Sequence, residues 1–139
     1  MPGLVRIDTS TFFDRDKVLD KLDRDERRLL SRAGAFVRRR ARSSIRKRKG
    51  ISKSGKPPAS HTGQYKKSIL FGYEKSSRSV VIGPSASFGG SEVPELLEFG
   101  GSAKRGGRTV NYDARPHMGP ALEAETPNFP ELFTNSVTA

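Results

Sequence analysis

Residues 14–49, DRDKVLDKLDRDERRLLSRAGAFVRRRARSSIRKRK, form the longest stretch of this chain with a regular apolar rhythm. Apolar side chains recur there at steps of three and four residues, which places them along one face of an α-helix. These side chains are Val18, Leu19, Leu22, Leu29, Leu30, Ala33, Phe36, Val37, Ala41 and Ile45. A continuous helix over this stretch would be about 50 Å long at 1.5 Å per residue. The pattern therefore predicts one long N-terminal helix.

Charge is distributed unevenly along this predicted helix. Acidic residues gather in its first half, and basic residues fill its C-terminal end. This arrangement agrees with the helix dipole, which favours acid at the start and base at the end. Ser10, Thr11 and Asp14 are candidate N-caps. Gly34 interrupts the helix interior and indicates either a slight kink or a close approach by another backbone.

The composition limits the size of the core and points to charged partners. The chain has 139 residues, which fits one domain. Only 33% of the residues are hydrophobic, so the core should be small, and burial against other subunits is expected. Lysine and arginine number 26 against 15 acidic residues, a formal net charge of +11. This excess favours contact with nucleic acid, an anionic surface or acidic proteins without choosing among them.

Several classes of protein are disfavoured by what the sequence lacks. It has no cysteine, which excludes disulfides and thiolate zinc sites. Its apolar runs are all much shorter than the roughly 18 residues of a membrane span. The first ten residues, MPGLVRIDTS, lack the basic start and apolar core of a signal peptide. We therefore expect a protein made in a cytoplasm, with no membrane partner.

The middle of the chain has the pattern of β-strands. Residues 68–75 and 79–83 are apolar runs that predict the two strands of a β-hairpin. Residues 109–114 predict a further strand, and residues 4–8 predict a short edge strand. Residues 102–108 are basic and glycine-rich, and they predict a loop tip.

The remaining segments predict short helices and loops. Residues 93–99 predict a short helix, and Pro120 suits the start of another one. Residues 50–63 are rich in Ser, Gly, Pro and Lys and predict a flexible loop. Residues 126–133 predict a final docking turn, followed by a frayed tail at residues 134–139. The element order predicts a single α+β domain, with the long helix packed on a small antiparallel sheet.

Candidate catalytic and metal-binding residues are few. Ser60 and His61 are adjacent, so their side chains are poorly placed to meet as nucleophile and base. His117 with Asp113 and Glu123 lacks the regular spacing of metal ligands. We therefore expect no enzymatic activity, no metal and no cofactor.

One basic run is a candidate interaction site. Between residues 38 and 56 there are ten basic residues and no acidic one. They are Arg38, Arg39, Arg40, Arg42, Arg46, Lys47, Arg48, Lys49, Lys53 and Lys56. No pattern of aromatic residues accompanies them, so base stacking and sequence readout are not expected. Three interpretations remain open, namely contact with the DNA backbone, contact with an acidic protein, and a merely solvated surface.

Three segments in this order resemble a known family. They are residues 57–69, PPASHTGQYKKSI, residues 95–101, ELLEFGG, and residues 114–123, ARPHMGPALE. Together they resemble the small tail-completion or head–tail joining proteins of tailed double-stranded DNA bacteriophages, which include relatives of lambda minor tail protein Z. That family typically has a long N-terminal helix, a loop of the type PPxxxTGxLxxSI, a β-hairpin, an EFGT-like turn and an ARPFxxPAL segment.

This chain departs from the family pattern at three positions. Tyr65 stands where leucine is frequent, His117 where phenylalanine is common, and Gly101 where threonine often closes the turn. The physical role of the first motif still follows from its residues. Gly63 is free to take a positive φ, so the chain can turn there and aim Tyr65 and Ile69 into the sheet.

The second and third motifs are expected to pack on each other. Phe99 would be an apolar plug, and Glu98 would pair with Arg115. Pro116 and Pro120 would fix the entry to the last helix. The motif residues that we assign to structural or subunit contacts are Pro57, Pro58, His61, Thr62, Gly63, Tyr65, Ile69, Glu98, Phe99, Gly100, Arg115, Pro116 and Pro120.

The resemblance implies a non-enzymatic structural protein of the virion. Such a protein would form a ring, with six copies expected, at the head–tail junction, also called the neck. Its implied partners are further copies of itself, a head-side connector or stopper protein, and the tail terminator or tail tube protein. Genomic double-stranded DNA would pass through its channel, and assembly would take place in the bacterial host cytoplasm. The alternative is a free basic nucleic-acid-binding protein, of ribosomal or nucleoid type, that uses the basic end of the helix.

Overall fold

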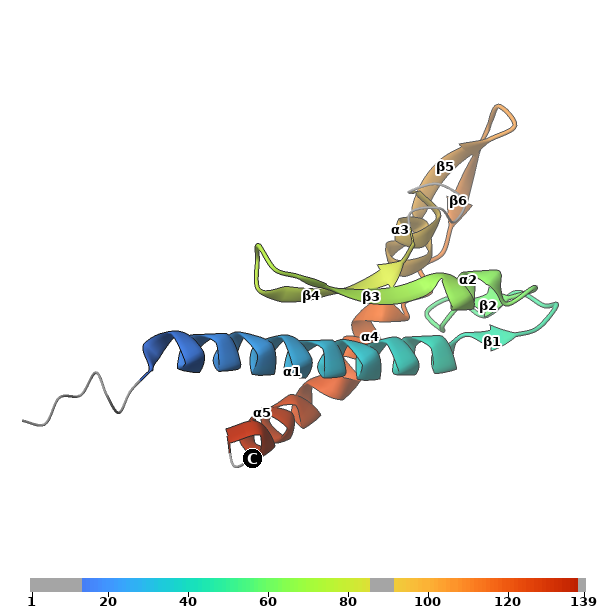
Figure 1. The fold of residues 1–139 in the computed structure, drawn as a ribbon. Helices are drawn as coiled ribbons and strands as arrows, with labels where there is room; N and C mark the ends of the chain where they lie inside the picture. Colours follow the sequence, from blue (N-terminus) through green and yellow to red (C-terminus); the bar gives the residue numbers. More distant parts are fainter. Residues whose placement is uncertain (1–13, 86–91, 138–139) are drawn as a thin grey trace, which may run out of the picture.

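A computed structural model describes residues 14–85 and 92–137 of the chain. The predicted strand at residues 4–8 and the cap candidates Ser10 and Thr11 lie outside these residues. The described part is an α+β fold, which confirms the predicted class. One long helix forms its spine, a β-hairpin lies along that helix, and a pair of short helices crosses it (Figure 1).

The long helix α1 spans Arg15–Ser44. Its N-cap is Asp14, whose carboxylate accepts a hydrogen bond from the backbone N–H of Lys17 at 3.1 Å. An aspartate in this position satisfies one of the free N–H groups of the first turn. One of the three predicted caps is therefore confirmed, together with the start of the helix.

The end of α1 comes five residues earlier than predicted, so the extension to Lys49 was wrong. Ile45 is extended, with φ −86° and ψ 112°, and its side chain is completely buried. Before it, the hydroxyl of Ser44 donates to the carbonyl of Ala41, and such local bonds compete with helix continuation. After it, β1 (Arg46–Lys47) pairs in parallel with β2 (Ala59–Ser60). A tertiary strand pairing thus overrides the local helical pattern.

The predicted hairpin is present as β3 (Ile69–Glu74) and β4 (Ser79–Pro84), antiparallel with Ile69 opposite Pro84. It lies along α1 (Figure 1). At Gly34 a side chain would place its Cβ 2.7 Å from Val80 Cγ2 and 3.2 Å from Phe71 Cδ2. This glycine therefore marks a close approach, but the approaching groups are side chains of the hairpin and not another backbone as predicted.

A second hairpin projects away from the helix (Figure 1). It follows α3 (Glu92–Phe99) and consists of β5 (Gly101–Arg105) and β6 (Arg108–Tyr112). The sequence predicted α3 and β6 closely, whereas β5 was predicted as part of a loop tip. Only Ala103 of β5 is buried, so the strand carries little of the apolar pattern from which strands are predicted.

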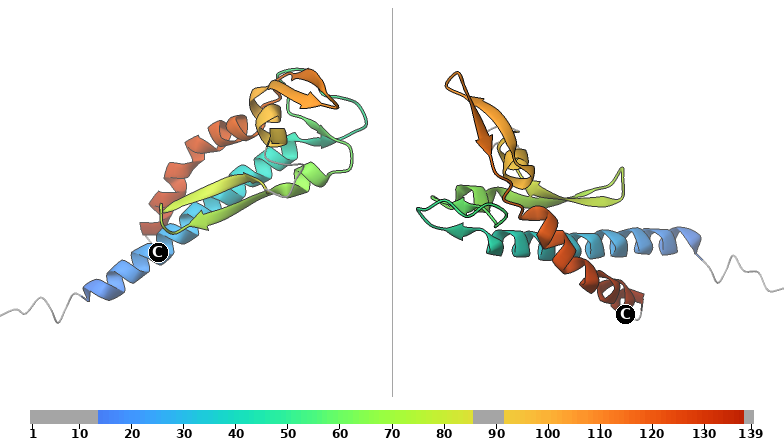
Figure 2. Two further views of the ribbon diagram at one scale, coloured as in Figure 1. Left: turned by 90° about the horizontal axis from the view of Figure 1, so that it is seen from above. Right: turned by 180° about the vertical axis from the view of Figure 1, so that it is seen from behind.

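The chain ends in two short helices that cross α1 (Figure 2). Helix α4 (Met118–Glu125) leads through the 3₁₀ turn η2 (Thr126–Asn128) into α5 (Phe129–Val137). Pro120 lies in the first turn of α4, in agreement with the prediction of a helix there. Helix α5 was predicted only as a docking turn followed by a frayed tail from residue 134, whereas the helix continues to Val137. Its apolar residues Phe129, Leu132, Phe133 and Val137 recur at steps of three and four, a helical period that the prediction overlooked.

The core lies where α1, the first hairpin and α4 meet. Its buried residues are Val37, Ala41, Ile45, Tyr65, Ile69 and Ala121. The strands do not merge into one sheet as expected, but remain three two-stranded sheets in the described part of the chain. The apolar stripe of α1 is only partly covered. Val18, Leu19 and Leu22 are 38%, 47% and 56% exposed, because the first turns of α1 extend beyond the rest of the domain (Figures 1 and 2).

Candidate functional site

The three motif segments meet at one cluster of hydrogen bonds, which we call the motif junction and define as Tyr65, Glu98 and His117. Tyr65 comes from the short helix α2 (Gln64–Ser68), Glu98 from α3, and His117 from the residue before α4. The Tyr65 hydroxyl lies 2.8 Å from His117 Nε2. The junction therefore joins parts of the chain that are up to 52 residues apart in sequence.

Glu98, about twenty residues earlier in the sequence, caps the N-terminus of helix α4. Its carboxylate accepts hydrogen bonds from the backbone N–H groups of His117 at 3.0 Å, Met118 at 3.0 Å and Gly119 at 2.8 Å. Burial disfavours the charged form, but these three donors and His117 outweigh it, so the pKa of Glu98 lies below its ordinary value. A carboxylate at a helix N-terminus is also favoured by the helix dipole.

His117 is 1% exposed and has two sets of neighbours. Its Nδ1 lies 3.1 Å from the carbonyl oxygen of Arg115 and 3.1 Å from the Glu98 carboxylate. Burial lowers the pKa of His117 below 6.5, against the opposing effect of these two acceptors. The ring is therefore neutral near pH 7, and we assign its proton to Nδ1, so that Nε2 accepts the Tyr65 hydroxyl.

The side chains of the motif junction are enclosed by the surrounding segments. Tyr65 is 6% exposed, and burial followed by the nearby Glu98 charge raises its pKa well above the ordinary value. A neutral histidine, a protonated tyrosine and an ionised glutamate complete each other's hydrogen bonds here. Such a network stabilises one arrangement of the surrounding segments.

Two predictions for these motifs were wrong. Arg115 does not pair with Glu98, because its guanidinium donates to the carbonyl oxygens of Ser52 at 3.2 Å and Asp113 at 3.1 Å. Phe99 is not a plug within the subunit, since it is 77% exposed. Both errors have one cause. The backbone N–H groups at the N-terminus of α4 bind the Glu98 carboxylate. This contact fixes the rotation of α3 about its axis, which leaves Arg115 without Glu98 as a partner and Phe99 in solvent.

The other residues of the second and third motifs are packed closely together. Gly100 has φ 72°, and a Cβ there would lie 2.9 Å from both the Ala114 N and the Tyr112 O atoms. Only glycine fits this approach of two backbones. Pro116 is half-buried just before the junction, and Pro120 is exposed on α4.

The first motif forms a tight turn that leads into the core. Gly63 has φ 81° as predicted, and its N–H donates to the Ser60 hydroxyl at 3.1 Å. The Thr62 hydroxyl accepts from the Gln64 N–H at 3.3 Å. Tyr65 and Ile69 are buried, which confirms their predicted direction. Of the remaining motif residues, Pro58 is buried, Pro57 is half-buried, and His61 is exposed.

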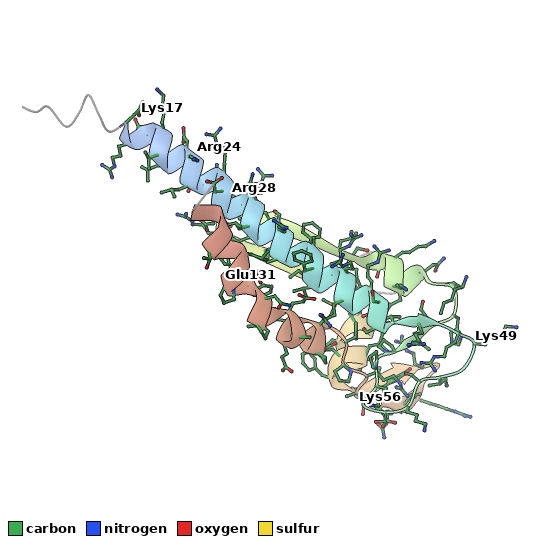
Figure 3. All side chains as sticks on the ribbon, turned by 90° about the horizontal axis from the view of Figure 1, so that it is seen from below. Lys17, Arg24, Arg28, Lys49, Lys56 and Glu131 are labelled. Atoms are coloured by element: carbon green, nitrogen blue, oxygen red, sulfur yellow. The ribbon has the colours of Figure 1, made fainter. Side chains whose placement is uncertain are left out.

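The predicted flexible loop is docked on the third motif at two points. The Gly55 N–H donates to the Ala114 carbonyl at 2.8 Å, and Arg115 bonds the carbonyl of Ser52. The loop also carries Lys56, which lies with Lys49, the residue just before the loop, at one end of the molecule (Figure 3).

The basic run divides into residues that hold the fold and residues that are free. Arg38 Nε donates to the Ile69 carbonyl at 2.9 Å, and Arg40 pairs with Glu125 at 2.7 Å. Arg39 lies with its guanidinium carbon 5.2 Å from the centre of the Phe36 ring. Arg42 is half-buried at the end of α1. The other six are exposed on β1 and the loop after it: Arg46, Lys47, Arg48, Lys49, Lys53 and Lys56.

Two open hollows flank α1. One, of about 640 Å³, lies between the helix and the tip of the first hairpin and is lined by Asp23, Arg27 and Arg78 among others. The other, of about 430 Å³, lies between α1 and α5 and includes Arg32 and Phe129. Both have linings of mixed charge. In the described residues, no three His, Asp or Glu side chains gather in a way that would hold a metal ion.

No helix in the part of the chain that the structure describes combines the length and apolar character that crossing a bilayer requires. Comparison of the chain with protein-family models, with curated proteins and with solved structures finds no match.

Proposed function

We propose that this protein is a non-enzymatic structural protein of the neck of a tailed double-stranded DNA bacteriophage. It forms a ring that completes the tail and joins it to the head-side connector around the DNA channel. The observation that carries this proposal is the resemblance of three motifs, supported by the way in which they meet. Tyr65, Glu98 and His117, one from each motif, form a single hydrogen-bonded junction. Three motifs that contact one another in the folded chain support the resemblance better than three motifs far apart in the structure would.

The uncovered apolar surface of the subunit also supports a role in an assembly. Ile51 is 82% exposed, Phe99 77%, Val81 64%, Leu22 56% and Leu70 49%. Single exposed apolar residues are ordinary, but these come from five different elements or loops of a domain with a small core. In a ring each subunit uses two different surfaces to contact its two neighbours, so apolar residues on several sides are expected.

The charges of α1 offer one such contact. Acidic residues between positions 16 and 26 of one copy would face basic residues between positions 38 and 49 of the next. Asp23 and Glu26 already bind Arg78 within the subunit. Of the other acids in this range, Asp25 is half-buried, whereas Asp16 and Asp20 are exposed and available to a neighbour. The charge-reversing variant Asp16→Lys with Asp20→Lys should then prevent ring formation and leave the monomer folded. Unchanged rings would contradict this contact.

The decisive experiment for the proposal is to locate the chain in a particle. Cryo-electron microscopy of the virion should find a ring of this protein between the head-side connector or stopper and the tail terminator or tube. Native mass spectrometry of the purified protein should detect the same ring, with six copies expected. A protein that stays monomeric and has no place at the neck would overturn the proposal.

A second candidate is a free nucleic-acid-binding protein of ribosomal or nucleoid type. The six exposed basic residues of β1 and its loop favour it. This candidate predicts a monomer that associates with cellular DNA or RNA and is absent from virions. The two candidates are therefore separated by where the protein is found.

A further inference from the structure

The outward face of α1 carries a row of positive charge that is broken only once. Its members, which we call the basic face, are Lys17, Lys21, Arg24, Arg28, Arg32, Arg39 and Arg42. On a helix of 3.6 residues per turn they fall within about a quarter of the circumference. Ala35, between Arg32 and Arg39, is the one uncharged position in the row. Six of the seven are exposed and Arg42 is half-buried; Figure 3 labels Lys17, Arg24 and Arg28 along the helix.

The basic face lies opposite the side of α1 that packs into the core. Ala33, Val37 and Ala41 are buried on that opposite side. Asp23 and Glu26 point to the first hairpin, where they bind Arg78. In the linear sequence acids and bases alternate through residues 14–28, and only the winding of the helix separates them into different faces.

Few of these charges are neutralised within the subunit. Lys17 pairs with Asp14 at 3.1 Å on the exposed first turn, and Glu131 of α5 lines the hollow that also holds Arg32 and Arg39. In the described part of the chain, Lys21, Arg28 and Arg42 take part in no ion pair. Like charges three or four residues apart on a helix destabilise it. The positive side chains of this face therefore repel one another, and a bound anion would relieve this repulsion.

We propose that the basic face binds the phosphate backbone of double-stranded DNA without reading its sequence. From Lys17 to Arg42 the row is about 38 Å long at 1.5 Å per residue. That length matches about 11 base pairs at 3.4 Å each, over which a duplex carries about 22 phosphates on two backbones that wind around the axis, so the row can meet phosphates where it crosses them. The choice of DNA as the polyanion rests on the proposed function, in which the genome passes through the ring.

Other anionic partners fit this surface less well. A helix that lies on a membrane inserts an apolar face into the bilayer, whereas the apolar face of α1 is packed in the core from Leu29 to Ala41, and only Val18, Leu19 and Leu22 of its first turns are partly uncovered. The basic face also has no Asn or Gln of the kind that reads base edges. Lys and Arg can also bond the edge of guanine, but seven of them spread along one rigid helix suit contact with phosphates, which gives affinity without sequence preference.

The test measures DNA binding by the full chain at several salt concentrations. Fluorescence anisotropy with a labelled 30-base-pair duplex of arbitrary sequence is suitable. The test variant is Lys21→Gln, Arg24→Gln, Arg28→Gln. The control variant, Lys67→Gln, Lys75→Gln, Lys104→Gln, removes the same net charge from exposed positions elsewhere. Circular dichroism and thermal unfolding establish that both variants are folded.

The test variant should reduce the slope of log K against log salt by about three, since each lost phosphate contact accounts for about 0.9. Its affinity near 0.1 M salt should fall on the order of 100-fold. The control variant should keep the slope and lose less than threefold in affinity. Equal losses in the two variants would overturn the inference, because binding would then follow net charge alone. Polyglutamate bound more tightly than DNA, through the same residues, would also overturn it and identify an acidic protein as the partner.

Failure of this inference and failure of the proposed function give different results. Ring formation is measured separately by native mass spectrometry without DNA. A ring whose DNA affinity does not depend on the basic face overturns only the inference. A monomer that binds DNA through this face supports the inference and overturns the proposed role in the neck.

Discussion

The two halves of α1 have the same apolar period but different surroundings. In the second half, Leu29, Ala33 and Val37 are buried against the hairpin and α4. In the first half, Leu19 and Leu22 continue the same stripe and are about half exposed. The period defines which face of a helix is apolar, whereas the path of the rest of the chain decides whether that face is covered. In the proposed ring, this uncovered half would be available to contact a neighbouring subunit.

The largest expected change in unfolding free energy distinguishes the covered half of α1 from the uncovered half. Ile45→Ala removes a side chain that is completely buried, and it should reduce the free energy of unfolding by about 2–5 kcal/mol. Leu22→Ala, on the exposed half, should change it by less than about 0.5 kcal/mol. Urea unfolding followed by circular dichroism measures both. Similar losses in the two variants would mean that the first half is covered within the monomer.

The next effect concerns the contact between the second half and the hairpin. Gly34→Ala should destabilise the protein by about 1–3 kcal/mol, because the new Cβ would lie 2.7 Å from Val80 Cγ2. Helix propensity alone predicts the opposite, a gain of about 1 kcal/mol. The double variant Gly34→Ala, Val80→Ala removes the clash and should be affected less than the sum of the single variants. Greater stability in the single variant Gly34→Ala would show that the hairpin is not held against the helix here.

A smaller, pH-dependent effect tests the motif junction, which packs on the buried half through Tyr65. The pKa of His117 is lowered below 6.5 in the folded protein by burial, so the unfolded chain takes up the proton first as pH falls. Stability should therefore decrease below about pH 6.5, by at most about 1.4 kcal/mol per pH unit from this residue. Thermal or urea unfolding between pH 7 and pH 5 measures the slope.

Two variants identify the source of that slope. His117→Phe should reduce it, although the loss of the Tyr65 bond will also reduce stability at every pH. His61→Gln, which removes an exposed histidine outside the junction, should leave it unchanged. An unaltered slope in His117→Phe would mean that His117 is not the residue that takes up the proton.

The variant with the smallest expected effect on monomer stability should have a large effect on ring assembly. Leu19→Ser with Leu22→Ser should leave the unfolding free energy within about 0.5 kcal/mol of the parent value, because both side chains are already largely in water. If the first half of α1 contacts a neighbouring subunit, the ring should dissociate at concentrations where the parent protein stays assembled. Analytical ultracentrifugation measures the difference. Rings of equal stability would place the subunit contact elsewhere.

Several features of the candidate site were accessible from the sequence for local reasons. The positive φ of Gly63 and the burial of Tyr65 and Ile69 followed from a turn and the strand after it. The role of Glu98 did not follow, because its three donors lie about twenty residues away. The bases of the first half of α1 were overlooked for another reason. They alternate with acids in the sequence and become one surface only when the residues are placed on the helix.

The sequence by itself determined the elements whose signals are local. The helix from Asp14, the first hairpin and α3 follow from period, caps and turn residues that act over a few positions. The tertiary structure decided where α1 ends, how Glu98 and Phe99 are turned, and which half of α1 is covered. Each of these depends on segments far apart in the chain. The strand pairing after Ile45, for example, supplies hydrogen bonds that no local pattern of the helix encodes.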